Sequence, residues 1–219
     1  YKYKIVSRIK INRYSYKQLQ EQILDESIII DNNYSNLNVP KIKPVIKELL
    51  PKNYIFFQFR YKFFKDLNWS NDNIILFLKF LKNSTGSVVF CSDIENNKIS
   101  NKYKKFFLDN FSYIDLNNNI IENKKDLTDI FYLKDLSGLD MFHIAQNSNM
   151  NIAKEGIVSH ISFFHKKKCH NLYNFKIINR DDVKQQKIGY SEWCKGMKNS
   201  FSFLNSDFTK TIRKIGKFI

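Results

Sequence analysis

The fold of this chain is decided by one stretch, Met150-Asn-Ile-Ala-Lys-Glu-Gly-Ile-Val-Ser-His-Ile-Ser-Phe-Phe-His165. Its first part, Met150 to Ala153, is short and apolar, which is typical of a buried strand, and Glu155-Gly156 interrupts it. From Ile157 onward the apolar residues recur at helical spacing. The stretch therefore predicts a strand, a sharp turn at glycine and a helix that opens directly out of the turn.

The helix predicted after Gly156 has an apolar face made of Ile157, Ile161 and Phe164. Its polar residues, Ser159, His160 and Ser162, are expected away from that face.

A helix that starts at such a turn presents free backbone N–H groups, and its dipole favours negative charge there. The carboxylate of Glu155 and the imidazole of His160 could add hydrogen bonds to a sugar and a phosphate bound at this helix start. The alternative is an ordinary strand-to-helix turn with a polar rim, because glycine is common after strands.

The composition is typical of a folded protein, but it does not decide which kind of partner the chain binds. The 219 residues fit one large domain or one domain with an appendage, and a hydrophobic content of 43% excludes wholesale disorder. The net charge of +15 indicates an acidic partner, such as nucleic acid, an anionic membrane surface or a phosphorylated substrate. The codon usage of an AT-rich genome is the alternative, because the excess is diffuse and almost all of it is lysine.

Cysteine and histidine positions favour a reducing compartment and no metal. Cys91, Cys169 and Cys194 lie far apart and in no C-x-x-C spacing, so we expect free thiols and a cytoplasmic protein. His160 and His165 are five residues apart, which is off the spacing of a helical metal pair. No window is apolar for the roughly 18 residues that a membrane span needs.

Strands and helices alternate regularly after Tyr54. We predict strands at Tyr54–Phe59, Ser87–Cys91, Tyr113–Leu116, Asp129–Leu133, Met150–Ala153 and near Asn171–Phe175, with helices at Asn73–Lys82, Asn101–Asp109 and Ser137–Ser148 between them. Strands separated by helices imply βαβ units and an α/β, Rossmann-like, mostly parallel sheet flanked by helices. Ligand loops then follow the carboxyl ends of the strands.

The two ends of the chain differ from this regular part. Residues 1–53 carry a possible strand at Lys4–Ile11, a helix at Ser15–Asp25 and a linker rich in Pro and Asn with a short helix at 42–50. We therefore predict three parts: 1–53, 54–180 as the Rossmann-like domain, and 181–219 as a helical tail. The tail has helices at Tyr190–Lys198 and Ser206–Ile219, the second basic and amphipathic. That helix could lie on an anionic membrane, although packing onto the domain is the commoner outcome.

The order of parts from Tyr54 to Phe175 resembles the C-terminal, nucleotide-sugar-binding half of GT-B glycosyltransferases. The nearest resemblance is to the ADP-heptose:lipopolysaccharide heptosyltransferase family, whose motif of an acidic residue, small residues and a histidine before a helix is occupied here by Glu155-Gly156-Ile157-Val158-Ser159-His160. The segment from Phe57 to Trp69 is similar to that family's first strand and loop, and Val88–Glu95 to its second strand. Two positions depart from the pattern, because Ile157 replaces a Gly or Thr and Leu67 replaces a Lys.

This resemblance implies a set of donor-binding residues and no cofactor or metal. The diphosphate would bind at Gly156 and at the backbone amides of Ile157 and Ser159. Glu155 would accept hydrogen bonds from the sugar hydroxyls. His160 would steady the motif or contact a phosphate, Arg60 or Lys65 would offset the leaving charge, and Glu95 would hold the ribose. The catalytic residues stay unassigned.

The resemblance further implies a glycosyltransferase of cell-surface glycan or lipopolysaccharide biosynthesis. Its partners would be a nucleotide-sugar, a glycan or lipid-linked acceptor and an anionic membrane, with no nucleic acid. It would be cytoplasmic and peripheral to the inner membrane. We expect the chain to be a fragment that lacks the acceptor domain, so that it binds a donor without transferring sugar. Trp193 and Phe208–Ile215 of the tail would then be left uncovered. A basic nucleic-acid-associated or non-catalytic interaction domain is the alternative.

Overall fold

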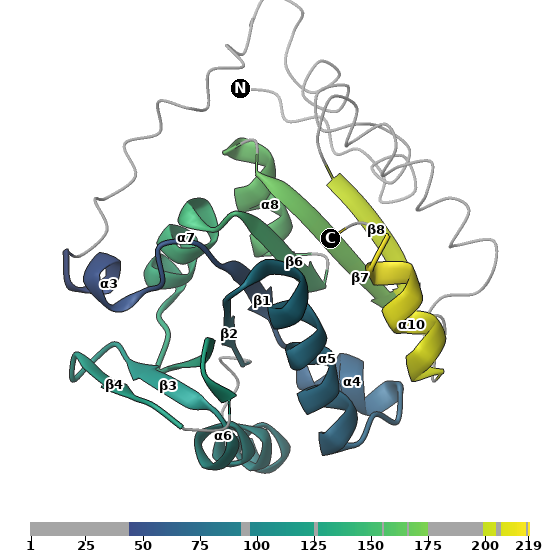
Figure 1. Ribbon diagram of the computed structural model, residues 1–219, viewed down its shortest axis with the longest axis horizontal. Coiled ribbons are helices and arrows are strands. Elements are labelled where there is room, and N and C mark those ends of the chain that lie inside the picture. The colour runs from purple at the N-terminus through teal and green to yellow at the C-terminus, as the bar shows by residue number, and fades with distance from the viewer. Residues whose placement is uncertain are drawn as a thin grey trace, which may run out of the picture.

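The computed structural model describes residues 44–92, 97–124, 127–154, 156–165, 167–174, 199–204, 207–217 and 219. Its centre is an eight-stranded sheet in the order β4-β3-β5-β2-β1-β6-β7-β8. Every neighbouring pair is parallel except β3 with β4. The sheet runs from the β3–β4 hairpin at the lower left of Figure 1 to β8 at the right. The predicted α/β, Rossmann-like, mostly parallel architecture is confirmed.

The strands and helices follow the predicted order closely. The strands are β1 (Ile55–Gln58), β2 (Val88–Cys91), β3 (Ser112–Asp115), β4 (Ile120–Glu122), β5 (Ile130–Lys134), β6 (Met150–Lys154), β7 (Lys168–Asn174) and β8 (Asn199–Leu204). The helices are α3 (Pro44–Leu49), α4 (Tyr61–Asp66), α5 (Asn71–Thr85), α6 (Lys98–Asn110), α7 (Gly138–Asn147), α8 (Ile157–Phe164) and α10 (Phe208–Ile215).

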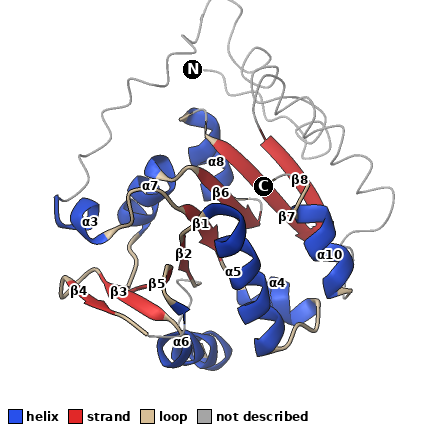
Figure 2. Cartoon of the chain, in the orientation of Figure 1, coloured by secondary structure: helices blue, strands red, loops and turns tan. Residues whose placement is uncertain are grey.

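Helices cover both faces of the sheet, which is why the central strands are apolar on both sides (Figure 2). Phe57 of β1 belongs to the core cluster beneath α4, α5, α6 and α10. Its neighbour Phe56 points the other way, into the cluster beneath α7 and α8. Successive strand residues thus alternate between two cores, as the period of two requires.

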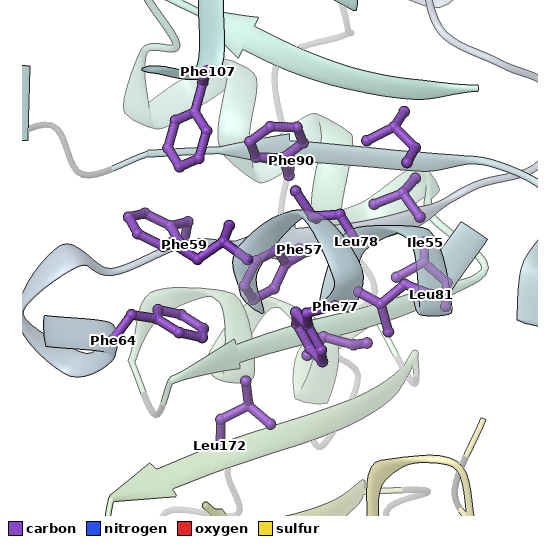
Figure 3. Close-up of a cluster of buried hydrophobic side chains, with 14 of the residues drawn as sticks. Ile55, Phe57, Phe59, Phe64, Phe77, Leu78, Leu81, Phe90, Phe107 and Leu172 are labelled. Carbon is purple, nitrogen blue, oxygen red and sulfur yellow. The ribbon is translucent and has the colours of Figure 1, made fainter. Parts of the chain in front are cut away.

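The first of these cores is unusually aromatic. Phe59 stacks on Phe64 with ring centroids 4.9 Å apart, and Phe57 meets Phe77 edge to face at 5.3 Å. Figure 3 shows these four rings within the cluster of buried side chains. Nine phenylalanines of the described residues are therefore packed in the interior, and those around Phe64 stabilise the position of α4 directly after β1.

Three elements were not predicted, and each is short or lies in a biased segment. The helix α4 follows β1 after only two residues, β4 lies within the Asn-rich segment, and β8 lies within the predicted helical tail. Because β8 pairs in parallel with β7, the sheet extends beyond residue 180.

The prediction that the Phe208–Ile215 surface is uncovered is wrong. Phe208 contacts Trp69 with ring centroids 5.0 Å apart, and Ile215 is fully buried. The apolar side of α10 therefore packs on this domain beside α5 (Figure 1). The predictions at Lys4–Ile11, Ser15–Asp25 and around Trp193 lie outside the described residues.

The predicted apolar face of α8 is also wrong in part. Ile157 is 52% exposed, whereas Ser159 and Ser162 are buried. Ser159 donates to Oδ1 of Asn171 in β7, and Ser162 accepts from Nδ2 of Asn151 in β6 at 2.9 Å. Serine is buried here because neighbouring strands supply its hydrogen-bond partners.

No helix in the described ranges is long and apolar enough to cross a membrane.

One charged pair is embedded at the carboxyl end of β3. The buried carboxylate of Asp115 accepts from Lys134 Nζ at 2.7 Å and from the backbone N–H groups of Asn117 and Asn118 at 3.1 Å each. The Lys134 ammonium, and then the Asn118 and Asn117 donors, hold the pKa of Asp115 at about 2. A carboxyl whose pKa is lowered on folding stabilises the folded state above its unfolded pKa, and that stabilisation is lost as the pH falls toward 2.

We expect Asp115→Asn to lower the free energy of unfolding by about 1–2 kcal/mol at neutral pH. It should also remove most of the acid-induced loss of stability between about pH 4 and pH 2. Urea unfolding at a series of pH values measures both effects. The matched control is Asp135→Asn, because that exposed carboxylate lies 4.0 Å from the same ammonium and should contribute little. Equal effects of the two substitutions would contradict the role of the buried pair.

Candidate functional site

The strand order creates one position where the connections change direction. After β1 the chain adds β2, β3 and β5 on one side, and it then crosses back to add β6, β7 and β8 on the other side. β1 and β6 are neighbours, yet their following connections run in opposite directions. In open parallel sheets, ligands bind outside the carboxyl ends of the strands at such a switch point. The candidate site is therefore the edge after Gln58 and Lys154.

The register brings two predicted site residues to this edge. Gln58 is paired with Ala153, so that Arg60 and Gly156 follow the ends of two adjacent strands. Arg60 is half-buried, has an extended backbone (φ −126°, ψ 106°) and directly precedes α4. Its carbonyl oxygen accepts from Phe63 N at 3.0 Å and from Phe64 N at 3.3 Å, which fixes the start of that helix.

Gly156 makes the turn between β6 and α8. Its φ of +155° lies in a region that favours glycine, and a Cβ built there would meet only the Lys154 carbonyl oxygen, at 3.9 Å. The Gly156 carbonyl accepts from Ser159 N at 3.0 Å, so the first turn of α8 closes directly behind the glycine. The helix α8 thus begins directly after β6 and the Gly156 turn, as predicted.

Ser159 is part of the interior. Its hydroxyl is buried and donates to Asn171, while its amide is used in the turn to Gly156. Ser159 therefore holds α8 against β7, and the amides that precede it in the turn are the ones left for an anion.

The other predicted residues are less closely grouped. Lys65 is exposed in the last turn of α4, about 6 Å further along the helix axis than the first residue of that helix. Ile157 is exposed at the first position of α8, and the backbone of His160 lies in the same helix. Glu95 and Glu155 lie outside the described residues.

Sequence reasoning missed Lys154, which ends β6 and is exposed beside the switch point. Its position in the sequence was a usable signal, because ligands in this fold class bind outside the carboxyl ends of the strands. Two further hydrogen bonds join elements near this edge of the sheet. Ser92 Oγ and Tyr132 Oη are 2.8 Å apart, and Gln58 Nε2 donates to Met141 Sδ at 3.5 Å. The first joins β2 to β5, and the second joins β1 to α7.

Within the described ranges, no group of three or more His, Cys, Asp or Glu residues is arranged to hold a metal ion.

Comparison with known proteins gives structural similarity only. No protein-family model matches the sequence, and no curated protein matches it. Similar solved structures include a putative UDP-N-acetylglucosamine 2-epimerase from Listeria monocytogenes, at a TM-score of 0.47 and 9% identity over 81% of this chain. The UDP-GlcNAc 2-epimerase of Methanocaldococcus jannaschii is similar at a TM-score of 0.44 and 11% identity over 78% of this chain. A structure of that enzyme in complex with UDP-GlcNAc and UDP is similar at a TM-score of 0.49 and 15% identity over 90% of this chain.

The chain spans 39%, 40% and 50% of the lengths of these three structures. At such low identity these proteins are similar to this chain in fold alone.

Proposed function

We propose that this chain binds the diphosphate of a nucleotide-sugar at the carboxyl ends of β1 and β6. One observation carries the proposal: the switch point of the sheet coincides with the Gly156 turn and the start of α8. Free amides at a helix start and a backbone without a Cβ suit a diphosphate, which needs close approach of several N–H donors.

The proposed roles of the surrounding residues follow from their chemistry. Arg60, at the end of the adjacent strand, offers a guanidinium to a phosphate oxygen. Lys154 adds a second positive charge at the same edge. The resemblance to the heptosyltransferases suggests three further roles. Glu155 would bind the sugar hydroxyls, Glu95 the ribose and His160 a phosphate.

We propose that this site is the donor-binding part of a glycosyltransferase that acts on a cell-surface glycan or lipopolysaccharide-type acceptor. The bond between the sugar and the diphosphate breaks as an acceptor hydroxyl attacks the sugar, and negative charge grows on the leaving diphosphate. Arg60 and the amides at Gly156 would stabilise that charge, which is the electrostatic contribution such transfers depend on. The catalytic base and the acceptor-binding groups remain unassigned.

Calorimetric titration with UDP, ADP and GDP tests the binding proposal. We expect Arg60→Gln to weaken nucleoside diphosphate binding about 10- to 100-fold, because a hydrogen bond to a charged group is lost. The matched control is Lys65→Gln, which removes the same charge from the far end of α4 and should change the affinity less than about threefold. If no nucleotide produces heat, the alternative of a non-catalytic interaction domain is favoured.

A product assay tests the reaction separately. We expect the chain alone to bind the donor without transferring sugar, and transferred sugar would show that a complete active site is present. Transfer releases a nucleoside diphosphate and moves the sugar to the acceptor, and both can be followed by mass spectrometry. A nucleotide-sugar whose sugar is isomerised, with no diphosphate released, would instead indicate an epimerase.

A further inference from the structure

The two helical layers of the molecule differ in charge. The helices α4, α5, α6 and α10, which cover one face of the sheet, contain eleven Lys and Arg residues and three Asp. The helices α7 and α8, which cover the other face, contain no Lys or Arg in 18 residues and one Asp. Since 36 of the 219 residues are Lys or Arg, a codon bias alone would place cations on both layers. Among these six helices of the described residues, the positive charge is therefore concentrated on one face of the sheet.

Nine of these eleven cations are exposed, and all eleven lie on packed helices. We define the basic face by its exposed members, Lys62, Lys65, Lys79, Lys98, Lys102, Lys105, Lys210, Arg213 and Lys214. α10 supplies three of them, and its apolar side is buried against α5 and Trp69. Their positions are thus fixed by the fold rather than by a separate tail (Figure 1).

We propose that the basic face docks on an anionic lipid surface. The exposed apolar side chains that accompany the cations are aliphatic: Leu76 on α5 is 51% exposed and Ile99 on α6 is 40% exposed. Lysine charges with scattered aliphatic residues suit the headgroup region of a bilayer, where each cation adds attraction and apolar area adds to it.

Nucleic acid fits this face less well. Single-stranded nucleic acid stacks on exposed aromatic rings, and specific contacts favour arginine. All the large hydrophobic side chains found exposed in the described part of the chain are aliphatic, whereas the phenylalanines of this layer are buried or partly buried against the core. Arg213 is the one arginine within these four helices.

Vesicle co-sedimentation of the full chain tests the proposal. We expect binding to phosphatidylcholine vesicles that contain about one third phosphatidylglycerol, weak binding to pure phosphatidylcholine, and release at high salt. Lys98/Lys102/Lys105→Gln should lower the partition coefficient about 100-fold, from the attraction of three surface lysines. The control Lys47/Lys52/Lys168→Gln removes the same charge outside these helices, from exposed positions, and should bind within about threefold of the parent.

Equal losses in the two triple variants would overturn the proposal, because net charge rather than this face would then control binding. Binding of a single-stranded oligonucleotide without binding of anionic vesicles would overturn it in favour of nucleic acid. Amine labelling of the unmodified protein with mass spectrometry gives a second readout that needs no variant. Vesicles should protect Lys98, Lys102 and Lys105 but not Lys47, Lys52 and Lys168, and the reverse pattern would contradict the proposal. The inference does not depend on nucleotide binding, which we place at the carboxyl ends of the strands.

Discussion

Replacing Gly156 by valine is expected to abolish nucleoside diphosphate binding, with affinity falling by at least about 100-fold. The backbone of Gly156 has φ +155°, which a residue with a branched side chain rarely adopts. The turn would have to change its path, and the amides at the start of α8 would change direction with it. The added methyl groups would also crowd the backbone at the position where we place the diphosphate. Calorimetry against the best-binding nucleotide measures the loss.

A control glycine distinguishes the effect of backbone strain on folding from the loss of the nucleotide-binding site. Gly86 also has a positive φ, of +93°, and a Cβ there meets nothing within 4 Å. It precedes β2 and thus lies at the amino end of a strand, away from the proposed ligand. Gly86→Ala and Gly156→Ala should each destabilise folding by about 1–2 kcal/mol, and Gly156→Ala alone should weaken nucleotide binding. If Gly156→Val binds within threefold of the parent, the diphosphate does not sit at this turn.

The folded protein should lose about 3 kcal/mol of stability between about pH 7 and pH 4 because of one buried histidine. His170 in β7 is completely buried, and burial, with a smaller contribution from Lys168, lowers its pKa from 6.5 to about 4. The neutral imidazole is favoured in the folded state, so this contribution is complete above pH 6.5 and declines as falling pH protonates the unfolded chain. Below about pH 4 both states are protonated, and the contribution is gone.

Urea unfolding of His170→Gln at a series of pH values checks this expectation. The variant is expected to be less stable overall, so the measured quantity is the slope of unfolding free energy with pH, which should flatten between about pH 6.5 and pH 4. His165→Gln is the matched control. The pKa of His165 is also lowered by burial, but this side chain is not fully buried and its substitution should change the slope less. An unchanged slope in His170→Gln would show that another group accounts for the acid sensitivity.

The sequence alone determined the kind and order of most elements. β1, β2, β5 and β6 are apolar runs bounded by polar residues, and α5, α6 and α7 show a helical period, so their type depends on patterns within a few residues. The Gly156 turn was predictable for the same reason, because glycine after a buried run is a local signal. The parallel sheet followed from the alternation, because parallel strands need crossover connections.

Only the tertiary structure decided which residues meet. Arg60 and Gly156 are 96 positions apart, and they lie on adjacent strand ends because β6 pairs with β1 rather than with β5. The helical pattern places Ser159 away from the apolar face, yet it is buried because Asn171 of β7 accepts its hydrogen bond. The pattern of α10 allows either an uncovered apolar side or packing onto the domain, and the structure covers that side with Trp69 and α5. Each of these outcomes depends on partners from distant segments, and hydrophobic periodicity carries no information about which segment supplies the partner.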